Sequence, residues 1–107
     1  MSATGKPRRP KGPSIRFAIF NGFVDESLAS LSRAEIAVWL ILYRDGKSPQ
    51  WTARASLDDI ARRAGINRQT AHRAVASLTR RKMLRVIERG RLNGGPSSYI
   101  VFPRPME

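Results

Sequence analysis

The sequence contains no cysteine and only one histidine among its 107 residues. Without cysteine there is neither a disulfide framework nor a thiolate metal site, and a single histidine argues against structural zinc. The longest apolar block, Ile36 to Tyr43, is far too short to cross a bilayer, and no signal-peptide-like apolar run follows the basic N-terminus. We therefore expect a cytoplasmic chain with no metal, no cofactor and no membrane association.

Acidic residues are also scarce, because 8 Asp and Glu against 20 Lys and Arg give a net charge of +12. Such a balance implies a polyanionic partner, which can be DNA, RNA or an anionic membrane surface. No catalytic constellation is visible: His72 stands among arginines, and Asp58 and Asp59 are adjacent, so they point in different directions. The length suits one domain with a modest core, and we expect no enzyme activity.

The middle of the chain predicts two helices joined by a tight turn. Ser56 is a suitable N-cap for the first helix, expected over 57–64 with apolar residues at offsets of three and four. Gly65 stands where a helix ends in a left-handed residue, and Asn67 is a candidate cap for a second helix over 68–81. Small alanines on both helices allow a close crossing, which is typical of a helix-turn-helix.

The outward face of the second helix is polar, basic and free of carboxylates. From residue 60 to residue 91 there are ten Lys or Arg and a single acid, Glu88. A solvated face usually mixes both signs, because like charges repel at i,i+4 spacing, so this face indicates a duplex phosphate backbone. Arg can read guanine and Gln can read adenine. The candidates for base contacts are Arg68, Gln69, His72 and Arg73. The candidates for phosphate contacts are Thr70, Arg62, Arg63, Arg80, Arg81, Lys82 and Arg85.

Two β-rich runs follow this motif, Leu84 to Glu88 and Tyr99 to Phe102, around a glycine-rich segment. They predict a hairpin, or wing, in which Arg89 and Arg91 contact phosphate or the minor groove. A short strand expected at about 52–55 would pair with this wing.

Upstream, Ser32 and Glu35 form a capping box that opens a helix expected to run to about Arg44. This helix is apolar nearly all round, so it should be buried on several sides, with Trp39 in the core. The loop after it contains Trp51, which we expect to be exposed or packed at the rim as a cap on the core edge.

The N-terminal part gives weaker signals. Residues 15–24 alternate weakly and contain the turn signal Asn21-Gly22, which predicts an extended segment. Residues 25–31 suggest a short helical turn capped by Asp25. Residues 1–14 hold three prolines, two glycines and four basic residues, so we expect a disordered arm, either a solubilising tail or a segment lying along phosphates or in the minor groove. Its basic residues are Lys6, Arg8, Arg9 and Lys11.

The sequence resembles the winged helix-turn-helix family over residues 31–102, most of all bacterial regulators and plasmid or phage replication proteins. Lys82 stands where the family commonly has an exit glycine, which leaves the form of that turn open. The resemblance implies a mainly α fold with a small antiparallel β-wing, an α+β class, in one domain over 15–103 followed by a tail at 104–107. The residues that carry it are Ser56-Leu57-Asp58-Asp59-Ile60-Ala61, Gly65-Ile66-Asn67-Arg68-Gln69-Thr70-Ala71, Val75, Leu78 and Lys82-Met83-Leu84.

Together, the basic face and the resemblance imply sequence-specific binding of double-stranded DNA by a small, nucleoid-associated transcription regulator. Two alternatives remain: the origin-binding or initiator domain of a plasmid or phage replication protein, and a winged helix used for protein or RNA binding. The apolar helix and the phenylalanines upstream of it favour a homodimer through residues 15–44. The rival is a monomer in which residues 15–31 fold back over that helix.

Overall fold

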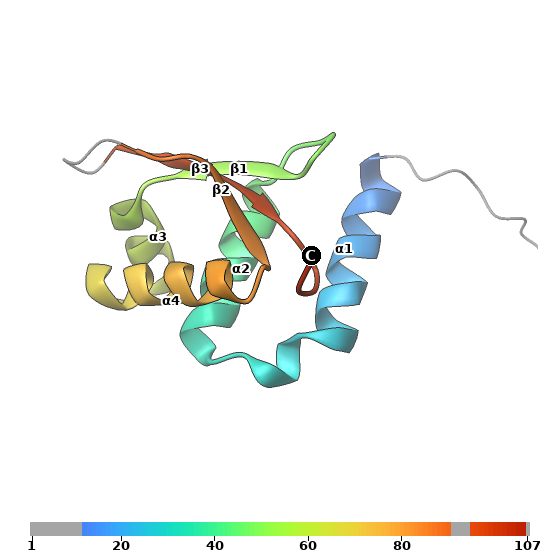
Figure 1. Cartoon of the computed structure of the whole chain (residues 1–107), viewed down its shortest axis with the longest axis horizontal. Coiled ribbons are helices and arrows are strands. Elements are labelled where there is room, and N and C mark those ends of the chain that lie inside the picture. The colour runs from blue at the N-terminus through green and yellow to red at the C-terminus, as the bar shows by residue number, and fades with distance from the viewer. Residues whose placement is uncertain (1–11, 91–94, 107) are drawn as a thin grey trace, which may run out of the picture.

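The computed structural model describes residues 12–90 and 95–106 of the chain (Figure 1). In this part, helices α2, α3 and α4 lie on one side of a three-stranded antiparallel sheet, and α1 stands at one end of the molecule. The mainly α fold with a small antiparallel sheet is therefore confirmed. The elements are α1 (Gly12–Glu26), the 3-10 helix η2 (Leu28–Ser30), α2 (Arg33–Asp45), β1 (Thr52–Ala55), α3 (Leu57–Ala64), α4 (Arg68–Arg80), β2 (Leu84–Glu88) and β3 (Ser97–Val101).

The sheet has the strand order β1-β3-β2, so the last strand of the described chain lies in the middle. Thr52 pairs with Ile100 on one side of β3, and Leu84 pairs with Val101 on the other. The register shifts between Val86 and Glu88, where β2 bulges. The wing hairpin and the strand at 52–55 are thus confirmed, although β3 begins at Ser97, two residues earlier than the sequence predicts.

The helix-turn-helix has the expected caps. The Ser56 hydroxyl accepts a hydrogen bond from the Asp59 amide at 3.1 Å, and the Asn67 side chain accepts one from the Thr70 amide at 2.7 Å. Gly65 between the two helices has φ of 71°, in the left-handed region that favours glycine. The small alanines of both helices are buried where α3 and α4 approach each other, as predicted.

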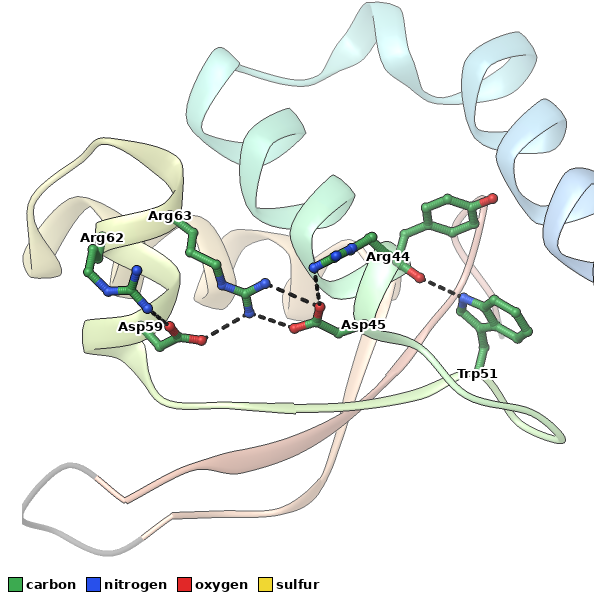
Figure 2. A network of polar contacts seen from close by, with 7 residues as sticks. Arg44, Asp45, Trp51, Asp59, Arg62 and Arg63 are labelled. Carbon is green, nitrogen blue, oxygen red and sulfur yellow. Dashed lines mark hydrogen bonds and ion pairs between the residues drawn. The ribbon is translucent and has the colours of Figure 1, made fainter.

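Helix α2 forms the centre of the core. Its capping box is present in both directions, and Trp39 is completely buried, with its indole nitrogen donating to the Phe102 carbonyl at 2.9 Å. Trp51 is only 4% exposed, so the exposed alternative is wrong and the residue caps the core. Its indole nitrogen donates to the Tyr43 carbonyl at the end of α2, at 2.9 Å (Figure 2).

The extended segment predicted over 15–24 is wrong, because these residues belong to helix α1. Ile15, Ile19 and Phe23 recur every four residues and face the domain, and this helical spacing overrides the weak alternation. The turn signal Asn21-Gly22 lies inside the helix, where Gly22 lets the backbone approach Pro103. The basic arm predicted over 1–14 is too long at its end, because α1 already begins at Gly12.

The short turn predicted over 25–31 is also placed differently. Asp25 belongs to the last turn of α1 instead of capping a new helix, and the 3-10 helix over 28–30 follows Ser27. The Ser27 hydroxyl donates to the Pro103 carbonyl at 2.7 Å, and Arg104 pairs with Glu26. The C-terminal segment therefore lies between α1 and the rest of the domain and holds α1 in place (Figure 1).

Candidate nucleic-acid interface

Helix α4 presents two chemically distinct faces. Its inner stripe, formed by Ala71, Ala74, Val75 and Leu78, is buried in the core. On its outer face Gln69, His72, Arg73 and Arg80 are exposed and Ala76 is half-buried, as the helical periodicity predicts. The outer face of α4 carries no carboxylate of its own.

This outer face forms a ridge between two hollows. One hollow, of about 470 Å³, lies between α4 and the wing, with Val86 and Tyr99 among its lining residues. The other, of about 520 Å³, lies between α4 and the first turn of α2. His72, Ala76 and Arg80 line both hollows, so they form the crest. A helix that stands out in this way can enter a groove about 12 Å wide, such as the major groove of B-DNA, with a phosphate strand on either side.

The cations around this ridge are largely free of internal partners. Arg73, Arg80, Lys82, Arg85 and Arg89 are exposed, and none of them makes an ion pair with another residue of the described ranges. Such unpaired cations can neutralise phosphate charge without first breaking an ion pair within the protein.

Arg63, on the last turn of α3, has a different environment from the cations around the ridge (Figure 2). Its two terminal nitrogens reach the Asp45 carboxylate at 3.1 and 2.5 Å, and one of them also reaches Asp59 at 2.9 Å. The hydrogen bonds and charge of Arg63 hold the pKa of Asp45 below its ordinary value, against the opposing effect of burial. Arg63 was expected to contact phosphate, but its guanidinium ties α3 to the end of α2. Arg62 pairs with Asp59 and remains mostly exposed.

Arg81 also forms an ion pair within the protein, although its side chain stays partly exposed. Its Nε lies 3.3 Å from a Glu35 carboxylate oxygen, which accepts a second hydrogen bond from the Ser77 hydroxyl. The other oxygen of Glu35 accepts from the Ser32 amide at 2.7 Å. Burial raises the pKa of Glu35, but the hydrogen bonds from Ser77 and Ser32 and the charge of Arg81 outweigh it, so the pKa is lowered. This network fixes the end of α4 against the start of α2.

Lys82 adopts the conformation that glycine usually supplies after a helix. Its φ is 64°, in the left-handed region. The Lys82 amide donates to the Thr79 carbonyl and the Met83 amide donates to the Leu78 carbonyl, both at 3.0 Å, which is the hydrogen-bond pattern of a Schellman motif. The exit turn left open by the sequence therefore keeps the usual geometry, and Lys82 is exposed beside it.

At the wing, Arg89 is exposed just after β2 and lines the hollow between α4 and the wing. The Gly90 amide donates to the Ser97 hydroxyl at 2.8 Å and closes the base of the hairpin. Arg85 lies over the Phe102 ring at 5.4 Å. The candidate Arg91 and the arm residues fall outside the described ranges, so the structure says nothing of them. These residues are Arg91, Lys6, Arg8, Arg9 and Lys11.

Two features of this surface were missed by the sequence reasoning. Asp58, on the first turn of α3, pairs with Arg68 at the start of α4, with Nε and Oδ1 3.1 Å apart. Ser32 and Ala34 line the second hollow, although the sequence assigned Ser32 only a capping role. The capping box marked a helix N-terminus, and its position beside α4 depends on the tertiary fold.

In the described ranges, no group of three or more His, Cys, Asp or Glu side chains is arranged to hold a metal ion. None of the described helices is both long and apolar enough to traverse a bilayer.

Comparison with known proteins agrees with this geometry. Residues 52–87, from β1 into β2, match the family model of the IclR helix-turn-helix domain. A similar solved structure is that of a transcriptional regulator of the MarR family from Silicibacter pomeroyi, with 17% identity, a TM-score of 0.53 and coverage of 83% of this chain. The chain spans 58% of the length of that protein, so the likeness concerns the fold. No curated protein matches the chain at a significant level.

Proposed function

We propose that this chain, which has a winged helix-turn-helix fold, binds double-stranded DNA sequence-specifically as a small transcription regulator. The observation that carries the proposal is the carboxylate-free ridge of α4, which stands between two hollows and is surrounded by exposed cations. In this role the protein acts by binding and not by catalysis, and it is found with the nucleoid in the cytoplasm.

The contacts divide into two classes. Gln69, His72 and Arg73 on the ridge, with Arg68 at its start, read base edges in the major groove. Thr70 and the cations around the ridge bind phosphates and set the register of the protein on the duplex. The proposed phosphate contacts are Thr70, Arg62, Arg80, Lys82, Arg85 and, from the wing, Arg89. Arg91 and the basic residues of the N-terminal arm remain candidates for further backbone contacts.

A replication initiator domain would use the same surface, so the alternative function differs in the identity of the target site. Binding to double-stranded RNA is disfavoured by the ridge, because the major groove of A-form RNA is deep and narrow and side chains cannot read it. The shape of α4 therefore supports duplex DNA over RNA.

The test is selection of bound sequences from a random duplex library, followed by titration of the protein with the most enriched sequence. We expect one preferred sequence that binds at least about a thousandfold more tightly than a scrambled duplex. Single- and double-stranded RNA of equal length should bind no better than the scrambled DNA. Equal affinity for all these ligands would overturn the proposal. The genomic position of the selected sequence, at a promoter or at an origin, then separates a regulator from an initiator.

We further propose that the protein forms a homodimer through residues 15–44, with α1 at the interface. The inner face of α1 is used within the chain, but Phe17, Phe20 and Val24 are 64%, 37% and 41% exposed. Phe20 lies at the edge of this face, where its ring also contacts that of Tyr43. The spacing of the three exposed residues, i, i+3 and i+7, forms one apolar stripe, which usually marks an interaction surface.

Antiparallel pairing of two copies about the midpoint of this stripe would set Phe17 of each copy opposite Val24 of the other. Helix α1 lies at the end of the molecule opposite α3, so pairing there leaves α4 accessible (Figure 1). Two ridges related by a two-fold axis fit a palindromic site with half-sites about one helical turn apart.

A further inference from the structure

Asp58 lies at the edge of the proposed DNA-binding surface, where a carboxylate opposes phosphate binding. Its side chain is 73% exposed, and its Oδ1 lies 3.1 Å from the Nε of Arg68, the first residue of α4. Among the described acids it alone forms an ion pair with one of the four residues proposed to read bases. An acid at this place weakens the general attraction of the surface for DNA, so its presence needs a reason.

The helix dipole favours an acid in the first turn of α3, but it does not require that acid to pair with Arg68. The stability of the ion pair does not supply a reason for that pairing. The Arg68 side chain is 55% exposed, and ion pairs between exposed side chains typically contribute little to folding. Arg68 is also in the first turn of α4, where the helix dipole disfavours a cation. The pair therefore holds Arg68 at the start of α4 but adds little to the free energy of unfolding.

The geometry of the pair leaves the base-reading part of the arginine available. A guanidinium carries five N–H donors in a rigid planar fork. The ion pair with Asp58 is closest at Nε, at the base of the fork, so the two terminal amino groups remain for a bidentate contact with guanine N7 and O6. Asp58 also repels a phosphate that would otherwise compete for the same amino groups.

We propose that Asp58 is a specificity-determining residue of the DNA-binding surface, which positions Arg68 toward a guanine and keeps it from phosphate. This inference rests on the proposed function, since it concerns how the same surface selects its target. It makes two opposite predictions for loss of the carboxylate: general affinity for DNA rises, and discrimination at one base pair falls.

The experiment compares the full-length wild-type protein with Asp58→Asn, Arg68→Ala and the double variant on the selected duplex, its single-base-pair variants and a scrambled duplex. We expect Asp58→Asn to bind the scrambled duplex about two- to threefold more tightly, because one repulsive charge is lost. Its preference at one G·C pair should fall about five- to tenfold, with the other positions unchanged. In the Arg68→Ala background, Asp58→Asn should have no further effect on that pair.

Two control variants separate charge from geometry. Glu88→Gln removes one exposed negative charge from the wing and should strengthen binding to all duplexes alike. Asp58→Glu keeps the charge but moves the carboxylate outward by one methylene, so it should lose discrimination without any gain in general affinity. Thermal unfolding of each variant reports that the fold is intact.

The inference is overturned if Asp58→Asn keeps the wild-type preference at every position. It is also overturned if the effect persists without Arg68, since Asp58 would then read a base directly, for example cytosine N4. In both cases the wild-type protein still selects a sequence. A wild-type protein that selects none would instead contradict the proposed function.

Discussion

Phe23 of α1 and Trp39 of α2 stack nearly parallel, with ring centroids 3.7 Å apart and planes 9° from parallel. Phe23 is 1% exposed, although it belongs to a helix that the sequence alone did not predict. This contact anchors the N-terminal helix to the centre of the core.

Phe23→Ala should therefore lower the free energy of unfolding by about 3–5 kcal/mol, the usual cost of emptying a buried aromatic site. Urea denaturation followed by tryptophan fluorescence measures it. Phe17→Ala, on the exposed face of the same helix, is the matched control and should change stability by less than about 0.5 kcal/mol in dilute solution. Equal losses for both variants would mean that α1 is not docked in this orientation.

Changing the outer stripe of α1 should abolish the proposed dimer without unfolding the protein. In sedimentation experiments at micromolar concentration, Phe17→Ser with Val24→Ser should give the 12.0 kDa monomer where the wild type gives the dimer. Ile87→Ser is the control, because Ile87 is 49% exposed but lies on the wing. A wild-type protein that stays at 12.0 kDa, alone and on an asymmetric site, would refute the dimer.

Arg73 and Arg85 should differ in what they contribute to DNA binding. Arg73→Ala should cost about 1–3 kcal/mol on the selected sequence and little on scrambled DNA, since Arg73 faces outward from α4. Arg85→Ala should weaken both duplexes equally and reduce the slope of log K against log salt by about 0.9, the loss of one phosphate contact. Binding isotherms at several salt concentrations measure both. An equal effect of Arg73→Ala on the two duplexes would show that α4 is not oriented toward the bases.

Arg63→Gln should affect stability more than DNA binding, because Arg63 is only 25% exposed and joins α2 to α3. We expect a loss of about 2 kcal/mol, below the range for fully buried pairs. The pKa of Asp45 lies below its ordinary value of 3.8, so its contribution is complete above that value and is lost as pH falls through the lowered pKa.

Urea unfolding as a function of pH measures the difference in the free energy of unfolding between the wild type and Arg63→Gln. Wild type and Arg63→Gln should differ most near neutral pH, and the difference should shrink as pH falls from the ordinary Asp45 pKa of 3.8 through its lowered pKa, because Asp45 is then protonated in both proteins. Arg62→Gln is the neighbouring control, since Arg62 is mostly exposed and should cost less than about 1 kcal/mol. A difference between wild type and Arg63→Gln that does not depend on pH would contradict the role given to Asp45.

Lys82→Gly should separate the backbone role of this residue from its charge. The left-handed conformation costs a lysine more than a glycine, so the variant should gain about 0.5–1 kcal/mol in the free energy of unfolding. At the same time it should bind all DNA sequences more weakly, because one phosphate contact is lost. Lys82→Ala is the control with the same loss of charge and no gain in stability. If Lys82→Gly is no more stable than Lys82→Ala, the turn is not strained by the side chain.

The helix-turn-helix could be predicted from sequence because its signals are local. Ser56, Gly65 and Asn67 each act on a backbone group within a few residues. The alanines are small, which indicates that the two helices cross closely. The outer face of α4 followed from periodicity alone. These features need no knowledge of the rest of the fold.

Whether an individual arginine is exposed or pairs with an acid could not be predicted in this way. Arg62 and Arg63 are neighbours of the same type, yet one is mostly exposed and the other bridges to Asp45, 18 residues earlier in the chain. The burial of Phe23 against Trp39 and the pairing of Arg81 with Glu35 depend likewise on contacts between distant segments. Sequence spacing measures none of these distances, so it could not show which candidate phosphate contacts also pair with an acid from another helix.

The position of β3 in the middle of the sheet has a consequence for how the chain folds during its synthesis. In the described chain β1 and β2 pair only through β3, and α1 is held partly by Pro103 and Arg104. A nascent chain that stops before residue 97 lacks β3, so β1 and β2 have no strand to pair with. It also lacks Pro103 and Arg104, which contact α1. Products that end before β3 should therefore be less stable than the full chain and should not bind the proposed DNA target.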